Sequence, residues 1–165
     1  HKQLDAFLAL LKDTGIVVRL DTNGTNPQAI KDLIARKLLD CIAMDIKSPL
    51  QKAKYELVSG VPCNIEDIEK SIRIIMESGI EYEFRTTVCP SQLDGDDIEE
   101  IARTIEGARR YILQGFRPNH CLDSKMLKIE PYPVETLRGF ASCAGKYVDY
   151  CCVRGEEGMV LQRNW

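Results

Sequence analysis

The chain has 165 residues, of which 44% are hydrophobic and 28% are charged, and this is the composition of a globular domain with one core. Its net charge of −3 gives no electrostatic basis for binding nucleic acid or an anionic membrane. Because no apolar run approaches the length of a membrane span and no signal peptide opens the chain, we expect a cytoplasmic protein.

Helical and extended patterns alternate along the sequence. Leu4, Phe7, Leu8 and Leu11 recur at helical spacing and predict an opening helix that ends by Gly15. Apolar runs then predict buried strands over 16–20, 41–46, 82–88, 111–116 and 147–153. Amphipathic segments predict helices after Asn26, after Asn64, after Asp94 and over 134–145. The connection from 47 to about 63 and the tail from 155 carry no readable pattern.

Strands that alternate with helices indicate βαβ units and a parallel sheet. The opening helix has no strand before it, and a complete eight-stranded barrel needs roughly 250 residues. We therefore expect an α/β fold that is a partial TIM-like barrel lacking its N-terminal βα units. It would be a single domain over 1–165, with barrel units over about 1–118 and a C-terminal helix and strand over about 133–153. A small open sheet of flavodoxin-like size is the alternative.

Polar residues gather at the predicted carboxyl ends of the strands, where α/β enzymes place their sites. The candidate site residues are Asp21, Thr22, Asn23, Asp45, Lys47 and Arg117 at these ends, together with Arg85 inside the strand over 82–88. Asp21 and Asp45, helped by the Thr22 hydroxyl, could share a cation through oxygen ligands. Lys47 and Arg85 could hold a carboxylate or a phosphate.

Each of these residues also has an ordinary structural interpretation. Asp21 could cap the turn that follows its strand, and Asp45 with Lys47 could form an ion pair of little energetic weight. Arg85 could pair with Glu83, which lies two residues away on the same face of the strand. The convergence of the whole set at one edge favours a functional site over these separate explanations.

Three strings in the sequence resemble a known family. Arg19-Leu20-Asp21-Thr22-Asn23-Gly24, Met44-Asp45-Ile46-Lys47 and Phe116-Arg117-Pro118 resemble successive strand ends of radical S-adenosylmethionine (SAM) activating enzymes of glycyl-radical enzymes. Within this family, the resemblance is strongest to the activating group of anaerobic ribonucleoside-triphosphate reductase, with pyruvate formate-lyase activating enzyme as a near relative. The agreement runs from about Leu4 to Pro118.

The resemblance implies a radical SAM-like partial barrel whose [4Fe–4S] cluster cleaves SAM to a 5′-deoxyadenosyl radical. That radical removes a hydrogen atom from a glycine of the partner glycyl-radical enzyme. By the same resemblance, Asp21, Thr22 and Asp45 would line a monovalent-cation and SAM site. Lys47 and Arg85 would contact polar groups of SAM or position the glycine loop, and Arg117 would lie near the nucleoside or the substrate opening.

The chain departs from the family pattern in its cysteines. Seven are present (Cys41, Cys63, Cys89, Cys121, Cys143, Cys151 and Cys152), but none forms the Cys-x-x-x-Cys-x-x-Cys motif that binds the cluster. Neither a disulfide scaffold nor a paired zinc motif fits their spacing, so we expect reduced thiols. Adjacent cysteines such as Cys151 and Cys152 cannot give three ligands to one cubane. We therefore expect no iron–sulfur ligands here and no activity of the chain alone.

The sequence also allows self-association and two alternative functions. Without a strand before it, the strand over 16–20 would be an exposed apolar edge, so the chain could self-associate through that edge. An alternative function is a non-redox α/β module that binds a small molecule or a partner. Another is an aldolase-like enzyme in which Lys47 is the nucleophile.

Overall fold

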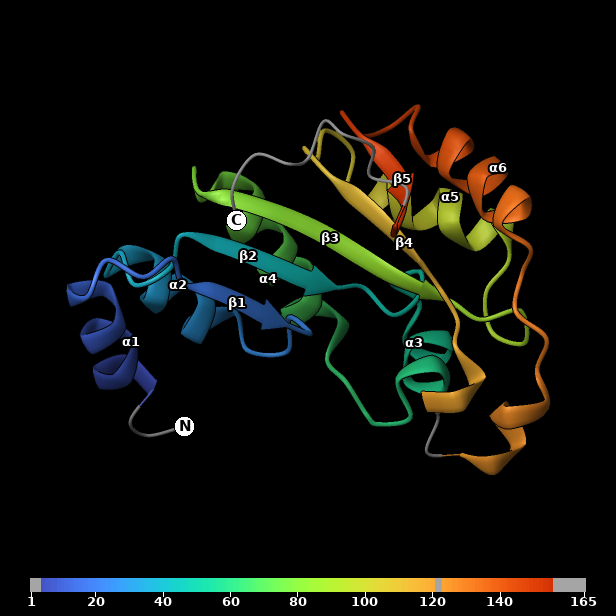
Figure 1. Cartoon of the computed structure of the whole chain (residues 1–165), viewed down its shortest axis with the longest axis horizontal. Helices are drawn as coiled ribbons and strands as arrows, with labels where there is room; N and C mark the ends of the chain where they lie inside the picture. The colour runs from blue at the N-terminus through green and yellow to red at the C-terminus, as the bar shows by residue number, and fades with distance from the viewer. Residues whose placement is uncertain (1–3, 121–122, 156–165) are drawn as a thin grey trace.

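The computed structural model describes residues 4–120 and 123–155. Five parallel strands form one sheet in the order β1-β2-β3-β4-β5, so each strand pairs with its neighbours in sequence (Figure 1). The strands are β1 (Arg19–Thr22), β2 (Cys41–Asp45), β3 (Glu81–Val88), β4 (Tyr111–Gly115) and β5 (Cys151–Val153). The parallel α/β sheet predicted from the sequence is confirmed.

Helices connect the strands, and polar side chains cap several of them. They are α1 (Leu4–Asp13), α2 (Pro27–Ala35), α3 (Lys52–Ser59), α4 (Ile65–Glu77), α5 (Gly95–Thr104) and α6 (Val134–Ala144), with 3-10 turns η1 (Pro118–His120) and η2 (Ser124–Lys128). The Asn26 side chain accepts from the Ala29 backbone N–H, and Asp94 with Asp97 forms a reciprocal capping box.

The sheet has one apolar face and one charged face, and β3 shows the division. Tyr82 and Phe84 point into the core and are at most 2% exposed, whereas Glu83 and Arg85 point to the opposite face. Helices α4 and α5 lie behind the sheet in Figure 1, and their isoleucines complete the core. Side chains on the charged face must therefore satisfy one another.

Three elements differ from their sequence-based prediction. Helix α3 was not expected, because Tyr55 is its one buried residue and it carries no apolar stripe. Pairing in the first strand begins at Arg19 rather than at Ile16, because Ile16 and Val17 are about half exposed. The last strand is shorter than predicted, since 145–150 forms turns before β5 begins.

In the part of the chain that the structure describes, none of the helices combines enough length with enough apolar character to cross a bilayer.

The turn after β1 supplies a test of core packing. Gly24 has a φ of +76°, and a Cβ there would overlap the Met44 side chain, which is fully buried. Gly60 has a φ of +73°, but a Cβ there would meet no atom within 4 Å. Gly60→Ala should therefore cost the left-handed strain alone, about 1–2 kcal/mol, and Gly24→Ala should cost about 1–3 kcal/mol more through overpacking. Equal free energies of unfolding for the two variants in urea titrations would contradict this account.

Candidate functional site

The guanidinium of Arg85 joins two carboxylates on the charged face of the sheet. Its Nε donates to Asp45 Oδ1 at 2.8 Å and its Nη1 donates to Asp21 Oδ2 at 3.0 Å. The Arg85 side chain is 11% exposed, whereas Asp21 is 57% exposed. A buried guanidinium requires such partners, because desolvating its charge alone costs several kcal/mol.

Strand register explains why these three residues meet. Asp45 lies directly opposite Arg85, and Asp21 lies opposite Ala43 on the other side of β2. Side chains at alternate positions share a face, and Ala43 is too small to separate its neighbours. Asp21 of β1 can therefore reach across to Arg85 of β3.

Lys47 extends this group beyond the end of β2. Its Nζ lies 3.1 Å from Asp45 Oδ2, so each oxygen of that carboxylate has a cationic partner. The Lys47 backbone N–H donates to the hydroxyl of Tyr55 at 3.3 Å. Burial raises the pKa of Tyr55 to about 12 despite that hydrogen bond. Helix α3, which the sequence pattern did not indicate, thus helps to fix the loop that carries Lys47.

A second group of charges lies toward the amino ends of the strands, around Glu83. The Glu83 side chain is 3% exposed, and its Oε1 accepts from Arg19 Nη2 and from Arg154 Nη2, each at 2.9 Å. Arg110 Nη2 lies 3.6 Å from its Oε2. Arg19 also donates through Nε to Asp21 Oδ1 at 2.8 Å, which joins the two groups.

These contacts exclude two of the structural interpretations that the sequence left open. A pair between Arg85 and Glu83 is wrong, since arginines from other segments surround Glu83. A capping role for Asp21 is also wrong. The turn is held by Thr22 Oγ1, which accepts from the Gly24 N–H at 3.1 Å, and by Asn23 Oδ1, which accepts from the Thr25 N–H at 3.2 Å.

The electrostatic environment favours the charged form of Asp21. Burial acts to raise the pKa of this carboxyl group, but hydrogen bonds from Arg19 and Arg85 outweigh it, so the pKa is lowered. A lowered pKa in the folded chain stabilises the fold above the unfolded value, about 3.9. That contribution disappears as the pH falls through the lower folded pKa.

A hollow of about 460 Å³ opens over this group, lined by Asp21, Thr22, Asn23, Asp45 and Arg85. All five lining residues are sequence-predicted site residues, and Lys47 adjoins them through Asp45. Carboxylate and hydroxyl oxygens suit a cation, and the guanidinium suits an anionic group. The hollow is therefore suited to a small zwitterionic or cationic ligand.

Arg117 lies outside this hollow. It is exposed and lines a separate pocket of about 730 Å³, which Thr87, Gln114 and Tyr132 also line. The structure thus divides the predicted set between two neighbouring pockets at the carboxyl end of the sheet. Gln114, Thr87 and Tyr132 gave no charge signal in the sequence, so their clustering depends on the fold.

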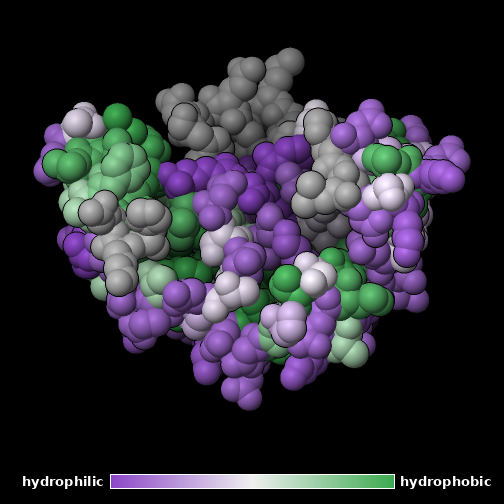
Figure 2. Space-filling model, turned by 90° about the horizontal axis from the view of Figure 1, so that it is seen from below, coloured by the Kyte–Doolittle hydropathy of each residue, from purple (hydrophilic) through white to green (hydrophobic). Residues whose placement is uncertain are grey.

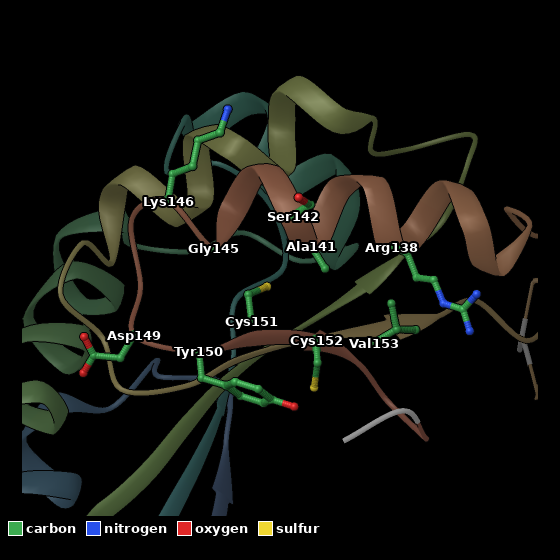
Figure 3. A pocket seen from close by; sticks show the side chains of 10 residues that line it. All are labelled: Arg138, Ala141, Ser142, Gly145, Lys146, Asp149, Tyr150, Cys151, Cys152 and Val153. Carbon is green, nitrogen blue, oxygen red and sulfur yellow. The ribbon is translucent and has the colours of Figure 1, made fainter. Parts of the chain in front are cut away.

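Another pocket, of about 500 Å³, lies between α6 and β5 (Figure 3). The side chains of Cys151 and Cys152 point to opposite sides of the strand there, as adjacent strand residues do. Burial raises the pKa of Cys151 to about 12, so this thiol is a poor thiolate ligand. The two cysteines do not form a shared metal site.

An iron–sulfur cluster does not fit the part of the chain that the structure describes. No three His, Cys, Asp or Glu side chains among those residues come together to hold a metal ion. The described cysteines are distributed over several elements. The thiolate ligands that such clusters require are therefore not assembled there.

Comparison with known proteins gives two informative matches. A protein of Methanocaldococcus jannaschii, provisionally named a glycyl-radical enzyme activating enzyme, is 36% identical over an alignment of 163 residues, and the match covers 94% of this chain and 67% of that protein. A crystal structure of a domain of pyruvate-formate lyase-activating enzyme from Bacteroides vulgatus superimposes with a TM-score of 0.71 at 18% identity. It covers 92% of this chain and 89% of that one, and it supports the fold. No family model matches the chain.

The link between Arg85 and Asp21 can be tested by titration. Arg85→Gln removes one of the two hydrogen bonds that lower the Asp21 pKa, so the pKa should rise toward its ordinary value. Carboxyl ¹³C NMR titration would measure this change. Asp40, which is held by Lys12 and the Val18 N–H, should titrate as before and serves as the internal control. An unchanged Asp21 pKa would contradict the assigned contacts.

Proposed function

We propose that this chain, which belongs to the glycyl-radical enzyme activating enzymes, supplies the SAM-binding and cation-binding part of a radical SAM activase. The observation that carries the proposal is the Arg85 guanidinium, which holds Asp21 and Asp45 together beneath a hollow at the carboxyl ends of the strands. Ligands of open α/β sheets bind at this end.

The charge pattern of the hollow supports SAM as its ligand. SAM carries an ammonium, a carboxylate and a sulfonium group within a few bonds of one another. Arg85 and Lys47 can interact with the carboxylate, and the half-exposed Asp21 can interact with a positive group. Asp45 forms ion pairs with both Lys47 and Arg85, so in this proposal it positions the residues that contact SAM.

A monovalent cation is the second ligand of the proposal. Asp21 and Asp45 would provide carboxylate oxygens, and Thr22 would provide its hydroxyl. Each oxygen retains a lone pair beyond the hydrogen bonds described above. Such a cation could bind these oxygens without displacing Arg85.

The proposed partner is a glycyl-radical enzyme, in keeping with the name of the archaeal relative. In the proposal, the pocket beside Arg117 opens toward that partner. The chemistry of radical generation would come from a [4Fe–4S] cluster, and the cysteines that the structure describes do not form its site. We therefore assign no redox step to the residues of this chain.

The Schiff-base alternative gains no support from the geometry. Lys47 Nζ lies 3.1 Å from Asp45 Oδ2, a contact that an ordinary ion pair explains. A nucleophilic lysine needs access to a carbonyl carbon.

Ligand binding tests the proposal directly. Isothermal titration calorimetry should detect SAM binding to the chain in the presence of potassium. Asp45→Asn should weaken that binding by about tenfold or more, because a charge-assisted hydrogen bond contributes about 1.5–3 kcal/mol. Asp40→Asn changes a carboxylate that is paired with Lys12 instead and should bind as the unmodified chain does. Loss of affinity in both variants, or in neither, would argue against the proposed site.

Iron reconstitution tests whether the cysteines of this chain can bind an iron–sulfur cluster. Anaerobic treatment with iron and sulfide, followed by iron analysis and low-temperature EPR after reduction, should yield far less iron than a cubane requires. The expected result follows from the dispersed cysteines. A stoichiometric cubane signal that shifts on addition of SAM would show that this chain assembles the cluster itself.

A further inference from the structure

Thr86 is a buried polar residue next to the candidate site. Hydrophilic side chains at the surface, which gather in the middle of the view in Figure 2, can form hydrogen bonds with water. Thr86 is 1% exposed and Tyr111 of β4 is fully buried, so their hydroxyl groups need partners within the protein. The partners therefore show which groups these two hydroxyls hold.

The Thr86 hydroxyl is paired with the backbone just beyond β2. Its Oγ1 donates to the Ile46 carbonyl at 2.8 Å and accepts from the Tyr111 hydroxyl at 2.9 Å. Because a hydroxyl has a single proton, the hydrogen bond from Tyr111 leaves the Thr86 proton for Ile46. The register of β2 with β3 ends at Asp45 opposite Arg85, so the Thr86 side chain extends the contact between the two strands by one residue.

Ile46 connects two residues of the candidate site. It is fully buried, and it lies between Asp45 and Lys47 in the sequence. Its N–H donates to the Arg85 carbonyl at 2.8 Å, and its carbonyl accepts from the Thr86 hydroxyl. Since β3 holds both backbone groups of Ile46, it also fixes the directions in which the two neighbouring side chains leave the backbone.

Successive residues of β3 hold the end of β2 from both faces of the sheet. Arg85 and Thr86 point to opposite faces, as neighbours in a strand do. On the charged face the Arg85 guanidinium donates to Asp45 Oδ1 at 2.8 Å, and on the core face the Thr86 hydroxyl donates to the Ile46 carbonyl. The two contacts act on adjacent residues of the chain, so loss of the second would let the carboxylate in the first move.

We propose that Thr86 is a positioning residue of the candidate site, which sets Asp45 and Lys47 through the Ile46 carbonyl. This inference rests on the proposed function, because Lys47 and Arg85 are the proposed contacts of the SAM carboxylate and Asp45 pairs with both. Thr86 itself touches no ligand in the hollow, since its side chain is buried on the core face.

A spectroscopic test follows from the contact between Arg85 and Asp45. Thr86→Val removes the hydroxyl with little change of shape, so the Ile46 carbonyl loses its donor and the Tyr111 hydroxyl loses its acceptor. The Arg85 Nε–H signal in ¹⁵N NMR spectra, identified by its loss in Arg85→Gln, should shift and should exchange with water about fivefold faster, the factor that one ordinary hydrogen bond represents. Thr86→Ser retains the hydroxyl and should restore the signal of the unmodified chain.

Ser78→Ala is the matched control for loss of a hydrogen bond. The Ser78 hydroxyl donates to the Ile75 carbonyl at 2.6 Å at the end of α4. Removal of either hydroxyl should lower the free energy of unfolding, so a urea titration alone would not separate a positioning role from a structural one. An Arg85 signal that is unchanged in Thr86→Val, or that changes equally in Ser78→Ala, would overturn the inference.

Isothermal titration calorimetry with SAM and potassium separates this inference from the proposed function. Thr86→Val should bind SAM about fivefold more weakly, whereas Thr86→Ser and Ser78→Ala should bind it as the unmodified chain does. If the unmodified chain binds no SAM, the proposed function fails, and the NMR comparison still decides whether Thr86 positions Asp45. If the unmodified chain and Thr86→Val bind SAM equally well, the positioning role is wrong. Circular dichroism would establish folding, and Tyr111→Phe, which removes the hydroxyl that directs Thr86, should move the Arg85 signal in the same direction should Thr86→Val not fold.

Discussion

The charged face of the sheet depends on one constraint, the need to neutralise the guanidinium of Arg85. This residue lies in the middle strand with 9% of its surface exposed, where an unpaired charge would cost several kcal/mol. Asp21 and Asp45 meet that need from two other strands. The same contacts that compensate a buried charge therefore fix the two carboxylates that the candidate site requires, and they do so across β1, β2 and β3.

Part of this arrangement was predictable from the sequence, because parallel strands bring their carboxyl ends to one edge. That rule places Asp21, Asp45 and Arg85 near one another without any coordinates. It does not identify the partner of Arg85. Side chains two residues apart lie on the same face of a strand, so Glu83 could pair with Arg85 as well as Asp45 could. Strand register makes the choice by setting Asp45 directly opposite Arg85. Arg110 and Arg154 lie just outside their strands, so their approach to Glu83 depends on tertiary geometry.

Other features were not predictable, for a different physical reason. Hydrophobic periodicity detects an element through the face that it buries, and α3 buries little besides Tyr55. Its contribution to the candidate site is the Tyr55 hydroxyl, which accepts from the Lys47 backbone N–H. The opposite error arose at Ile16 and Val17, which are apolar but about half exposed. Composition predicted a buried strand there, whereas pairing with β2 begins at Arg19.

Strand β1 joins the two groups of charges on the charged face of the sheet. The side chains of Arg19 and Asp21 belong to the network with Arg85 and Glu83, while their backbone groups lie in the plane of the sheet. The same four-residue strand therefore connects the buried Glu83 to the carboxylates of the candidate site. Because Asp21 accepts from both Arg19 and Arg85, the position of its carboxylate depends on the two groups together.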